Sequence, residues 1–468
     1  LNNFMLSRFG EKFTDLYKRF MPDSFVFAFL LTLLTAIASI LFLGATPIEI
    51  ITSWYKGFWG LLEFGMQLIL ILVTGYSIAL APQIDKGINK LSSFVKTPAQ
   101  VYLIVTVLGV LLSTISWGLI VVVAVLARQL ALKVKEINYP FLIACVYFAN
   151  NVWVTGLSSS IPLVLNTESN FIIKAGILEQ VIPTSYTLGS SLNFSILALY
   201  FVFAPILMLL LIPKKKEGYE LNDLIKNKTS IPSKSIIEEA GLSISKEKSF
   251  SDRLNHSKVL QFLIYLMGLI FIIYYFTTNG FDINLNIVIF IFIILGLILH
   301  QNPKRYSVAM KRASSNVSGI IFQFPFYAGI MGIMIHTGLG SNFAKWIANH
   351  ASIEFFPYIS FLIGGVVNFA IPSGGGEFAV IGPSLLEAAK EIAVGLPLDQ
   401  VTELISKTSL AIAYGESLTN LLQPFYLLIV LPVMGAGTYI EARDVMGYLV
   451  IPFIFFFIAE SFLILFLN

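Results

Sequence analysis

Two glutamates that interrupt apolar segments are the side chains in this sequence best suited to binding a proton or a cation. Glu377 lies in NFAIPSGGGEFAVIGPS at 368–384, and Glu416 lies in AYGESLTNLLQPFYLL at 413–428. Neither has a lysine or arginine near it in the sequence, and an unpaired charge in apolar surroundings costs several kcal/mol. We therefore expect a site for H⁺ or Na⁺ built from Glu377, Gly415, Glu416, Ser417, Thr419 and Asn420.

Three breaks in apolar runs, one of them the segment that contains Glu377, predict an anion site. PSGGGE at 372–377 is the most pronounced, and SWG at 116–118 and NNVWVTGLSSSIP at 150–162 are similar. Non-helical backbone at membrane depth is tolerated only where it is buried in protein or lines a cavity. A membrane helix that breaks in this way also leaves half-helix N-termini, which attract anions.

The expected ligand of these breaks is one carboxylate with a short hydrocarbon tail. No lysine or arginine lies inside an apolar run, so an anion would depend on helix N-termini, backbone amides and hydroxyls. Trp117 and Trp153 would contribute to apolar walls, although packing is the simpler interpretation of both. The predicted substrate-binding residues are Ser116, Trp117, Gly118, Asn150, Asn151, Gly156, Ser158, Ser159, Ser160, Ser373, Gly374, Gly375 and Gly376.

Composition places these breaks in a polytopic membrane protein. Apolar residues make up 56% of the 468 residues and charged residues only 12%, more than a soluble fold could bury. The net charge of +3 is too small to indicate nucleic-acid binding. With four histidines, one cysteine and no HExxH pattern, no catalytic constellation or bound cofactor is expected. Glu63 and Glu460 lie in runs without breaks, which favours structural roles for both.

The apolar runs predict about nine spans and two re-entrant hairpins. The hairpins are expected at 99–132 and 358–386, and an amphipathic helix on the membrane surface at 1–21. With the N-terminus cytoplasmic, this topology puts 25 of the 30 lysines and arginines inside and the C-terminus outside. The remaining runs are 22–44, 57–80, 140–165, 190–212, 259–278, 286–299, 316–336, 408–434 and 446–467.

A polar linker at 213–258 separates two corresponding halves. The first half, 22–212, contains the hairpin at 99–132 and a broken helix at 140–165. The second half, 259–468, contains the hairpin at 358–386 and a broken helix at 408–434. An extra span at 259–278 turns the second half over, so the expected fold is an all-α inverted repeat of the ion-transporter type, with its site at the repeat interface.

Several segments resemble the bacterial short-chain fatty acid transporter family. They include MPDSFVFAFLLTLL at 21–34, GLSSSIPL at 156–163, VIPTS at 181–185, NFAIPSGGGEFAVIGP at 368–383 and GESLTNLLQPF at 415–425. The resemblance implies a carrier of the bacterial inner membrane for small monocarboxylates such as butyrate and acetoacetate. It also implies kinship with divalent-anion sodium symporters, and hence an oligomeric scaffold, by analogy a dimer.

The expected mechanism is an elevator-type symporter in which one carboxylate is bound between the two hairpins and the two breaks. Ser373 and the amides of residues 374–376 would contact it from one side, and Ser116, Asn151 and Ser158 from the other. A di- or tricarboxylate symporter is an alternative, disfavoured because a second carboxylate has no evident positive partner. An anion channel is a further alternative, disfavoured by the inverted repeat and the paired hairpins.

Overall fold

The computed structural model describes residues 24–213, 218–225, 235–242, 249–314, 317–423 and 427–467. The predicted amphipathic helix at 1–21 lies outside these residues. Every regular element in the described part of the chain is a helix, and the one β-type contact is an isolated bridge between Ile225 and Thr438. The all-helical fold class is therefore confirmed.

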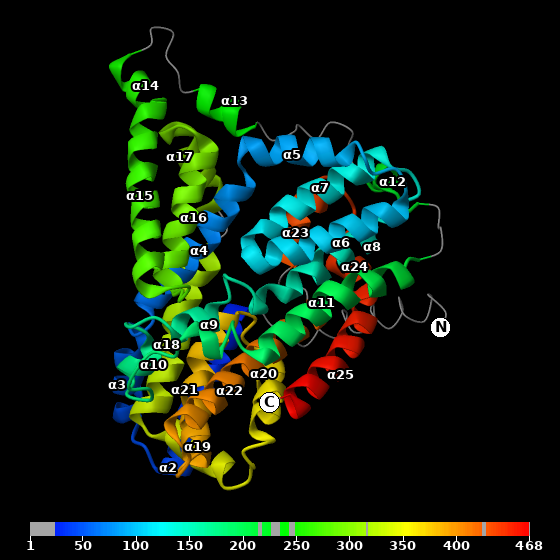
Figure 1. The fold of residues 1–468 in the computed structure, drawn as a ribbon. Helices are drawn as coiled ribbons and strands as arrows, with labels where there is room; N and C mark the ends of the chain where they lie inside the picture. The colour runs from blue at the N-terminus through cyan, green and yellow to red at the C-terminus, as the bar shows by residue number, and fades with distance from the viewer. Residues whose placement is uncertain are drawn as a thin grey trace.

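One set of helices, here the peripheral group, forms the left and lower-left part of the molecule in Figure 1. Within it, α18 packs on α2 and α3, while α4 packs on α16 and α17. Most of the surface of α15 is exposed, as expected for a helix facing lipid. The group comprises α2 (Ser24–Leu43), α3 (Pro47–Phe58), α4 (Leu62–Ala79), α15 (Lys258–Asn279), α16 (Leu285–His300), α17 (Pro303–Ala313), α18 (Ser318–His336) and α19 (Leu339–Ala348).

The remaining long helices form the central group. In Figure 1, α6, α7, α8 and α23 lie together above α20, α21 and α22, with α11 and α25 beside them. The group comprises α6 (Pro98–Ile115), α7 (Ile120–Lys133), α8 (Tyr139–Asn150), α9 (Ser160–Leu165), α11 (Ser191–Leu210), α20 (Phe356–Val367), α21 (Gly374–Ile392), α22 (Leu398–Thr419), α23 (Leu427–Met434) and α25 (Val450–Phe466). Short elements join the two groups and the linker: α5 (Pro82–Ser92), α10 (Phe171–Lys174), α12 (Leu221–Leu224), α13 (Ile236–Gly241), α14 (Phe250–Asn255) and α24 (Ala442–Met446).

Six helical stretches of the described residues are long and apolar enough to cross a membrane. The number is seven if α18 and α19, which meet at 69°, count as one bent span. These helices agree with a multi-pass membrane protein. The nine spans, the inverted repeat and the domain boundaries at 213 and 258 stay predictions.

Two of the predicted breaks differ in detail from the sequence-based expectation. The three glycines at 374–376 were expected outside a helix, but they form the first turn of α21. Gly415 was expected to interrupt a helix, yet α22 continues to Thr419, and the break begins with the 3₁₀ turn Asn420–Leu422. A Cβ on Gly415 would meet the carbonyl oxygen of Phe361, so this glycine allows α20 to pack closely on α22.

Two basic side chains, Arg128 and Lys390, each donate hydrogen bonds from one half of the chain to backbone carbonyls of the other half. The Arg128 guanidinium on α7 donates to the carbonyls of Val433 and Met434, each at 2.8 Å, and of Ala436, at 2.7 Å, at the end of α23. Lys390 on α21 donates to the carbonyl of Ile177, at 2.7 Å, just after α10. Cations are favoured at helix C-termini, where carbonyls lack helical partners. We call these contacts the crossed caps.

Candidate functional site

The N-terminus of α21 opens toward an acidic side chain and an indole ring. Ser373 is the N-cap residue, and its Oγ accepts a hydrogen bond from the amide of Gly376 at 3.4 Å. A Cβ placed on Gly374 would lie 3.1 Å from Oε2 of Glu416 and 3.2 Å from Cη2 of Trp153. Glycine therefore lets the carboxyl of Glu416 and the ring of Trp153 come close to a helix end that favours negative charge.

Glu377 and Glu416 are fully buried and close enough to repel one another electrostatically. Oε1 of Glu416 accepts a hydrogen bond from Nδ2 of Asn420 at 3.0 Å. Within the described residues, Oε2 of Glu416 and both carboxyl oxygens of Glu377 have no hydrogen-bond partner. Two adjacent carboxyls cannot both stay ionised without a cation, so the pair is suited to hold a proton or a hard cation.

Asn368 joins the α20–α21 turn to the second break. Its Nδ2 lies 2.9 Å from three acceptors: the carbonyl of Glu416, Oγ1 of Thr419 and Oδ1 of Asn420. Gln423 reinforces the connection by donating to the carbonyl of Asn368 at 3.2 Å. Our sequence analysis did not assign Asn368 to the site, although its position at the start of the glycine-rich stretch was a usable signal.

The first break is bound to the turn between α6 and α7. The amide of Trp117 donates to Oγ of Ser158 at 3.0 Å, and the amide of Leu157 donates to the carbonyl of Thr114 at 2.7 Å. Oγ of Ser113 donates to Oδ1 of Asn150 at 2.9 Å. A Cβ on Gly156 would collide with the backbone of Thr114, which explains glycine at that position. Ser158 and Asn150 therefore hold the two segments together.

Contacts between the two breaks complete the cluster. Oγ of Ser417 donates to the carbonyl of Asn151 at 2.6 Å, and the hydroxyl of Tyr147 donates to the carbonyl of Asn420 at 2.6 Å. The rings of Trp117 and Trp153 lie 6.3 Å apart, between the first turn and Gly374. The structure thus brings both turns and both breaks together around Trp153.

Four predicted substrate-binding residues contact the peripheral group instead. Ser116 and Gly118 pack against α4, where a Cβ on Gly75 would lie 2.5 Å from Oγ of Ser116. Gly375 packs against Phe64 and Leu68 of α4, and Gly376 against Tyr327 of α18. These are helix-packing contacts. Within the described residues, the hydroxyls of Ser116, Ser159 and Ser160 are buried without a hydrogen-bond partner.

A cavity of about 760 Å³ adjoins the first break. Its lining includes Thr155, Gly156 and Leu157 of the break, Thr114 of α6, and residues 183–185, 188 and 189. Asn193 also lines it and donates to the carbonyl of Thr155 at 3.0 Å. Of the predicted substrate-binding residues, Gly156 lines this cavity.

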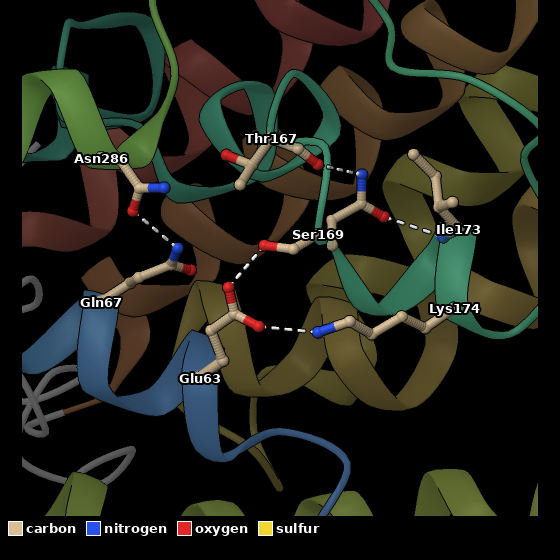
Figure 2. A network of polar contacts seen from close by, with 8 residues as sticks. Glu63, Gln67, Thr167, Ser169, Ile173, Lys174 and Asn286 are labelled. Carbon is tan, nitrogen blue, oxygen red and sulfur yellow. Dashed lines mark hydrogen bonds and ion pairs between the residues drawn. The ribbon is translucent and has the colours of Figure 1, made fainter.

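Polar contacts attach the segment after the first break to the peripheral group (Figure 2). Glu63, at the start of α4, accepts a hydrogen bond from Ser169 at 2.5 Å and pairs with Lys174 at 2.6 Å. Beside this pair, Nε2 of Gln67 on α4 donates to Oδ1 of Asn286 on α16 at 2.9 Å. Any motion of the central group relative to α4 would have to break the Glu63 contacts.

No cluster of three or more histidine, cysteine, aspartate or glutamate side chains suited to a metal ion occurs among the described residues. A Na⁺ ion near Glu377 and Glu416 would therefore use carbonyl and hydroxyl oxygens as well. Oxygen donors of this kind suit a hard cation. Thr419 and Asn420 both carry such oxygens next to Glu416.

Comparison with known proteins gives consistent similarities over nearly the whole chain. A family model described as "Short chain fatty acid transporter" matches residues 5–467. The chain is 36% identical over 454 residues to an Escherichia coli K12 protein named as a candidate short-chain fatty acid transporter, covering 96% of this chain and 97% of that protein. It is 34% identical over 456 residues to a Haemophilus influenzae protein of the same name, with coverage of 96% and 97%.

A solved structure has a similar fold. The Alcanivorax borkumensis YdaH transporter, described as having an unusual topology, superposes with a TM-score of 0.57. The superposition covers 95% of this chain and 98% of that one, at 14% identity. At this identity the similarity extends to the fold alone.

Proposed function

The chain belongs to the short-chain fatty acid transporter family, and we propose that it is a secondary active symporter of small monocarboxylates such as butyrate and acetoacetate. Family membership indicates a transporter, not an enzyme. The finer features proposed here are the substrate class, the coupled cation and the mode of movement. The main supporting observation concerns Oε2 of Glu416, beside Gly374 at the N-terminus of α21. This oxygen is buried and has no hydrogen-bond partner among the described residues.

Electrostatics at this position would couple the anion to a cation. A carboxylate bound at the N-terminus of α21 would lie next to Glu416, and two negative charges at such short range in a buried site repel strongly. A proton on Glu416, or Na⁺ between the two carboxylates, removes the repulsion. The anion and the cation would therefore bind together, and each would raise the affinity for the other.

The single carboxylate is the favoured substrate because the site has one positive helix end and no cation. Within the described residues neither Glu377 nor Glu416 forms an ion pair, so a second carboxylate would find no positive partner there. Trp153 and Trp117 would contact the hydrocarbon tail. A di- or tricarboxylate symporter stays the second candidate, with an anion channel behind it.

We further propose an elevator-type movement of the central group against the peripheral group. Packing of small residues at the boundary between the two groups supports this proposal. Among the described residues, four of them contact α4 and α18 without forming hydrogen bonds to these helices: Ser116, Gly118, Gly375 and Gly376. No polar contact opposes sliding at these four positions, whereas the contacts of Glu63 with Ser169 and Lys174 would have to break. In a bacterial inner membrane, with the N-terminus cytoplasmic and the C-terminus outside, the peripheral group would form the dimer scaffold.

Uptake of labelled butyrate into proteoliposomes tests this function. A Na⁺ gradient and a pH gradient are imposed separately on liposomes that contain the purified protein. Accumulation driven by either gradient supports a symporter and identifies its cation. Uptake of succinate or citrate in place of butyrate would favour the second candidate, and conductance without saturation would favour a channel.

A further inference from the structure

A third buried acid lies outside the site described above. Glu460, in the middle of α25, is 2% exposed and packs among aromatic rings. Its Oε1 accepts a hydrogen bond from the hydroxyl of Tyr200 at 3.1 Å. Within the described residues its Oε2 has no partner. The ring of Tyr200 is fixed in turn against Phe456, with centroids 4.2 Å apart.

Tyr200 connects this acid to the first break. Its hydroxyl oxygen accepts a hydrogen bond from Nδ2 of Asn151 at 2.7 Å. Asn151 begins the 3₁₀ segment Asn151–Thr155, and its carbonyl accepts the hydrogen bond from Ser417. The amide oxygen of Asn151 accepts nothing from the described residues, and the side chain keeps a residual exposure of 5%. The Nδ2 end of this amide is therefore fixed by Tyr200, whereas the Oδ1 end has no partner among the described residues.

No cation balances Glu460 within the described part of the chain. On α11, the titratable group facing it is Tyr200. On α22 it is Tyr414, which is close enough for an electrostatic interaction and donates to Oδ1 of Asn193 at 2.9 Å. Lys407 of α22 contacts α25 only at its far end, where it donates to the carbonyl of Leu467 at 2.6 Å. The carboxyl thus has a single hydrogen-bond donor, Tyr200.

We propose that Glu460 is a proton-binding positioning residue whose protonation turns the amide of Asn151 toward the anion site. With Glu460 ionised, one N–H of Asn151 donates to Tyr200 and Tyr200 donates to Glu460, so Asn151 presents its oxygen and one N–H to the remaining space. With a proton on Glu460, the carboxyl donates to Tyr200, and Tyr200 donates to the oxygen of Asn151. The NH₂ group of Asn151 is then released and can donate to a carboxylate.

The proton therefore raises the affinity for the anion without any contact between Glu460 and the substrate. One O–H bond forms on Glu460 and one breaks in the hydronium ion that supplies the proton, and two hydrogen bonds reverse direction. Because binding free energies are linked, the anion raises the affinity of Glu460 for its proton by the same factor. The effect on substrate rests on the function proposed above, whereas the titration of Glu460 does not.

Infrared spectroscopy of the reconstituted protein without substrate tests the titration directly. Raising the pH should remove a carboxylic-acid C=O band in the wild type. This band should be missing from the spectrum of Glu460→Gln. In Tyr200→Phe the band should be present at a shifted frequency. Ser461→Ala, which changes the adjacent buried hydroxyl on α25, is the matched control and should keep the wild-type band. An unchanged band in Glu460→Gln, or one that ignores Tyr200→Phe, overturns the proposal.

Butyrate binding then tests the effect on Asn151. In Glu460→Gln the side-chain NH₂ donates permanently to Tyr200, which mimics the protonated acid. At high pH the variant should bind butyrate about tenfold more tightly than the wild type. Calorimetry in buffers of different ionisation enthalpy should show that the variant takes up as much as one proton fewer per bound butyrate than the wild type. Wild-type proton uptake in the variant overturns the proposal. Absence of butyrate binding in the wild type would instead overturn the transport function, leaving the infrared result to decide on Glu460.

Discussion

Gly374 lies at the start of α21 and Glu416 near the end of α22, yet a Cβ on the glycine would lie 3.1 Å from the carboxyl oxygen Oε2 of the glutamate. The positive end of α21 therefore lies beside the carboxyl oxygen of Glu416 that has no hydrogen-bond partner among the described residues. This proximity is the physical basis of the coupling proposed above, because an anion cannot bind at that helix end beside an ionised carboxylate.

Gly374→Ala should weaken butyrate uptake. The added methyl group would lie within 3.2 Å of Trp153 and close to Glu416, and would fill the space intended for the carboxylate. We expect KM to rise about tenfold, which corresponds to about 1.4 kcal/mol, with little loss of folded protein. Proteoliposome uptake measures the change. Gly87→Ala, on the exposed helix α5 with no atom within 4 Å of the new Cβ, is the control and should leave KM unchanged.

Glu416→Gln and Glu377→Gln should abolish or strongly reduce the dependence of uptake on the coupling cation. Each glutamine keeps the shape of the acid but removes the charge that the proton or Na⁺ neutralises. In Glu416→Gln the hydrogen bond from Asn420 is retained, so folding should survive. Uptake is measured across a series of Na⁺ concentrations and pH values. Glu49→Gln, an exposed acid at the start of α3, serves as control. Unchanged cation dependence in both site variants would remove this assignment.

Asn368→Asp should damage the second break more than Asn368→Ala. The amide donates toward three acceptors, whereas an aspartate would place a fourth acceptor among them and a further negative charge beside Glu416. Loss of a buried hydrogen bond costs about 1 to 3 kcal/mol, and a buried unpaired charge costs more. Thermal unfolding in detergent should show the order wild type, Ala, Asp. Asn89→Asp, on the exposed face of α5, should unfold like the wild type.

Arg128→Gln should destabilise the fold while leaving the binding residues in place. The guanidinium satisfies three carbonyls at the end of α23, and a hydrogen bond to a charged group contributes about 1.5 to 3 kcal/mol. Since a glutamine could replace one of these bonds, we expect a loss of about 3 kcal/mol, measured as a lower unfolding midpoint. Arg253→Gln, at an exposed position of α14, should change it little. Equal stability of both variants would argue against the crossed caps.

The sequence was sufficient to single out the two glutamates and the glycine-rich turn, because acids and consecutive glycines are unusual within an apolar run. It was less informative about glycine. Gly415 and Gly374 look alike in sequence, but Gly415 permits a close approach of α20, whereas Gly374 permits a close approach of the Glu416 carboxyl and the Trp153 ring. That distinction depends on what lies opposite the glycine, which no local pattern contains.

The sequence also could not show which residues distant along the chain contact one another. Asn368 makes its hydrogen bonds to residues 48 to 52 positions later, and Glu460 reaches the first break only through Tyr200, 260 positions earlier. Asn368 was marked only by its place at the start of the glycine-rich stretch, and Glu460 lies in an apolar run without a break. Neither hydrophobic periodicity nor charge counts could have connected them to the site, because these patterns describe one segment at a time.

The crossed caps also constrain how the protein is made. Ile177 obtains its lysine from a position 213 residues later, and α7 holds an arginine whose carbonyl partners lie more than 300 residues downstream. A ribosome therefore releases the first half into the bilayer well before its last polar partners exist. The two halves synthesised separately should be unstable alone but assemble when produced in the same cell, and insertion factors would have to shield Arg128 until residue 436 has been added.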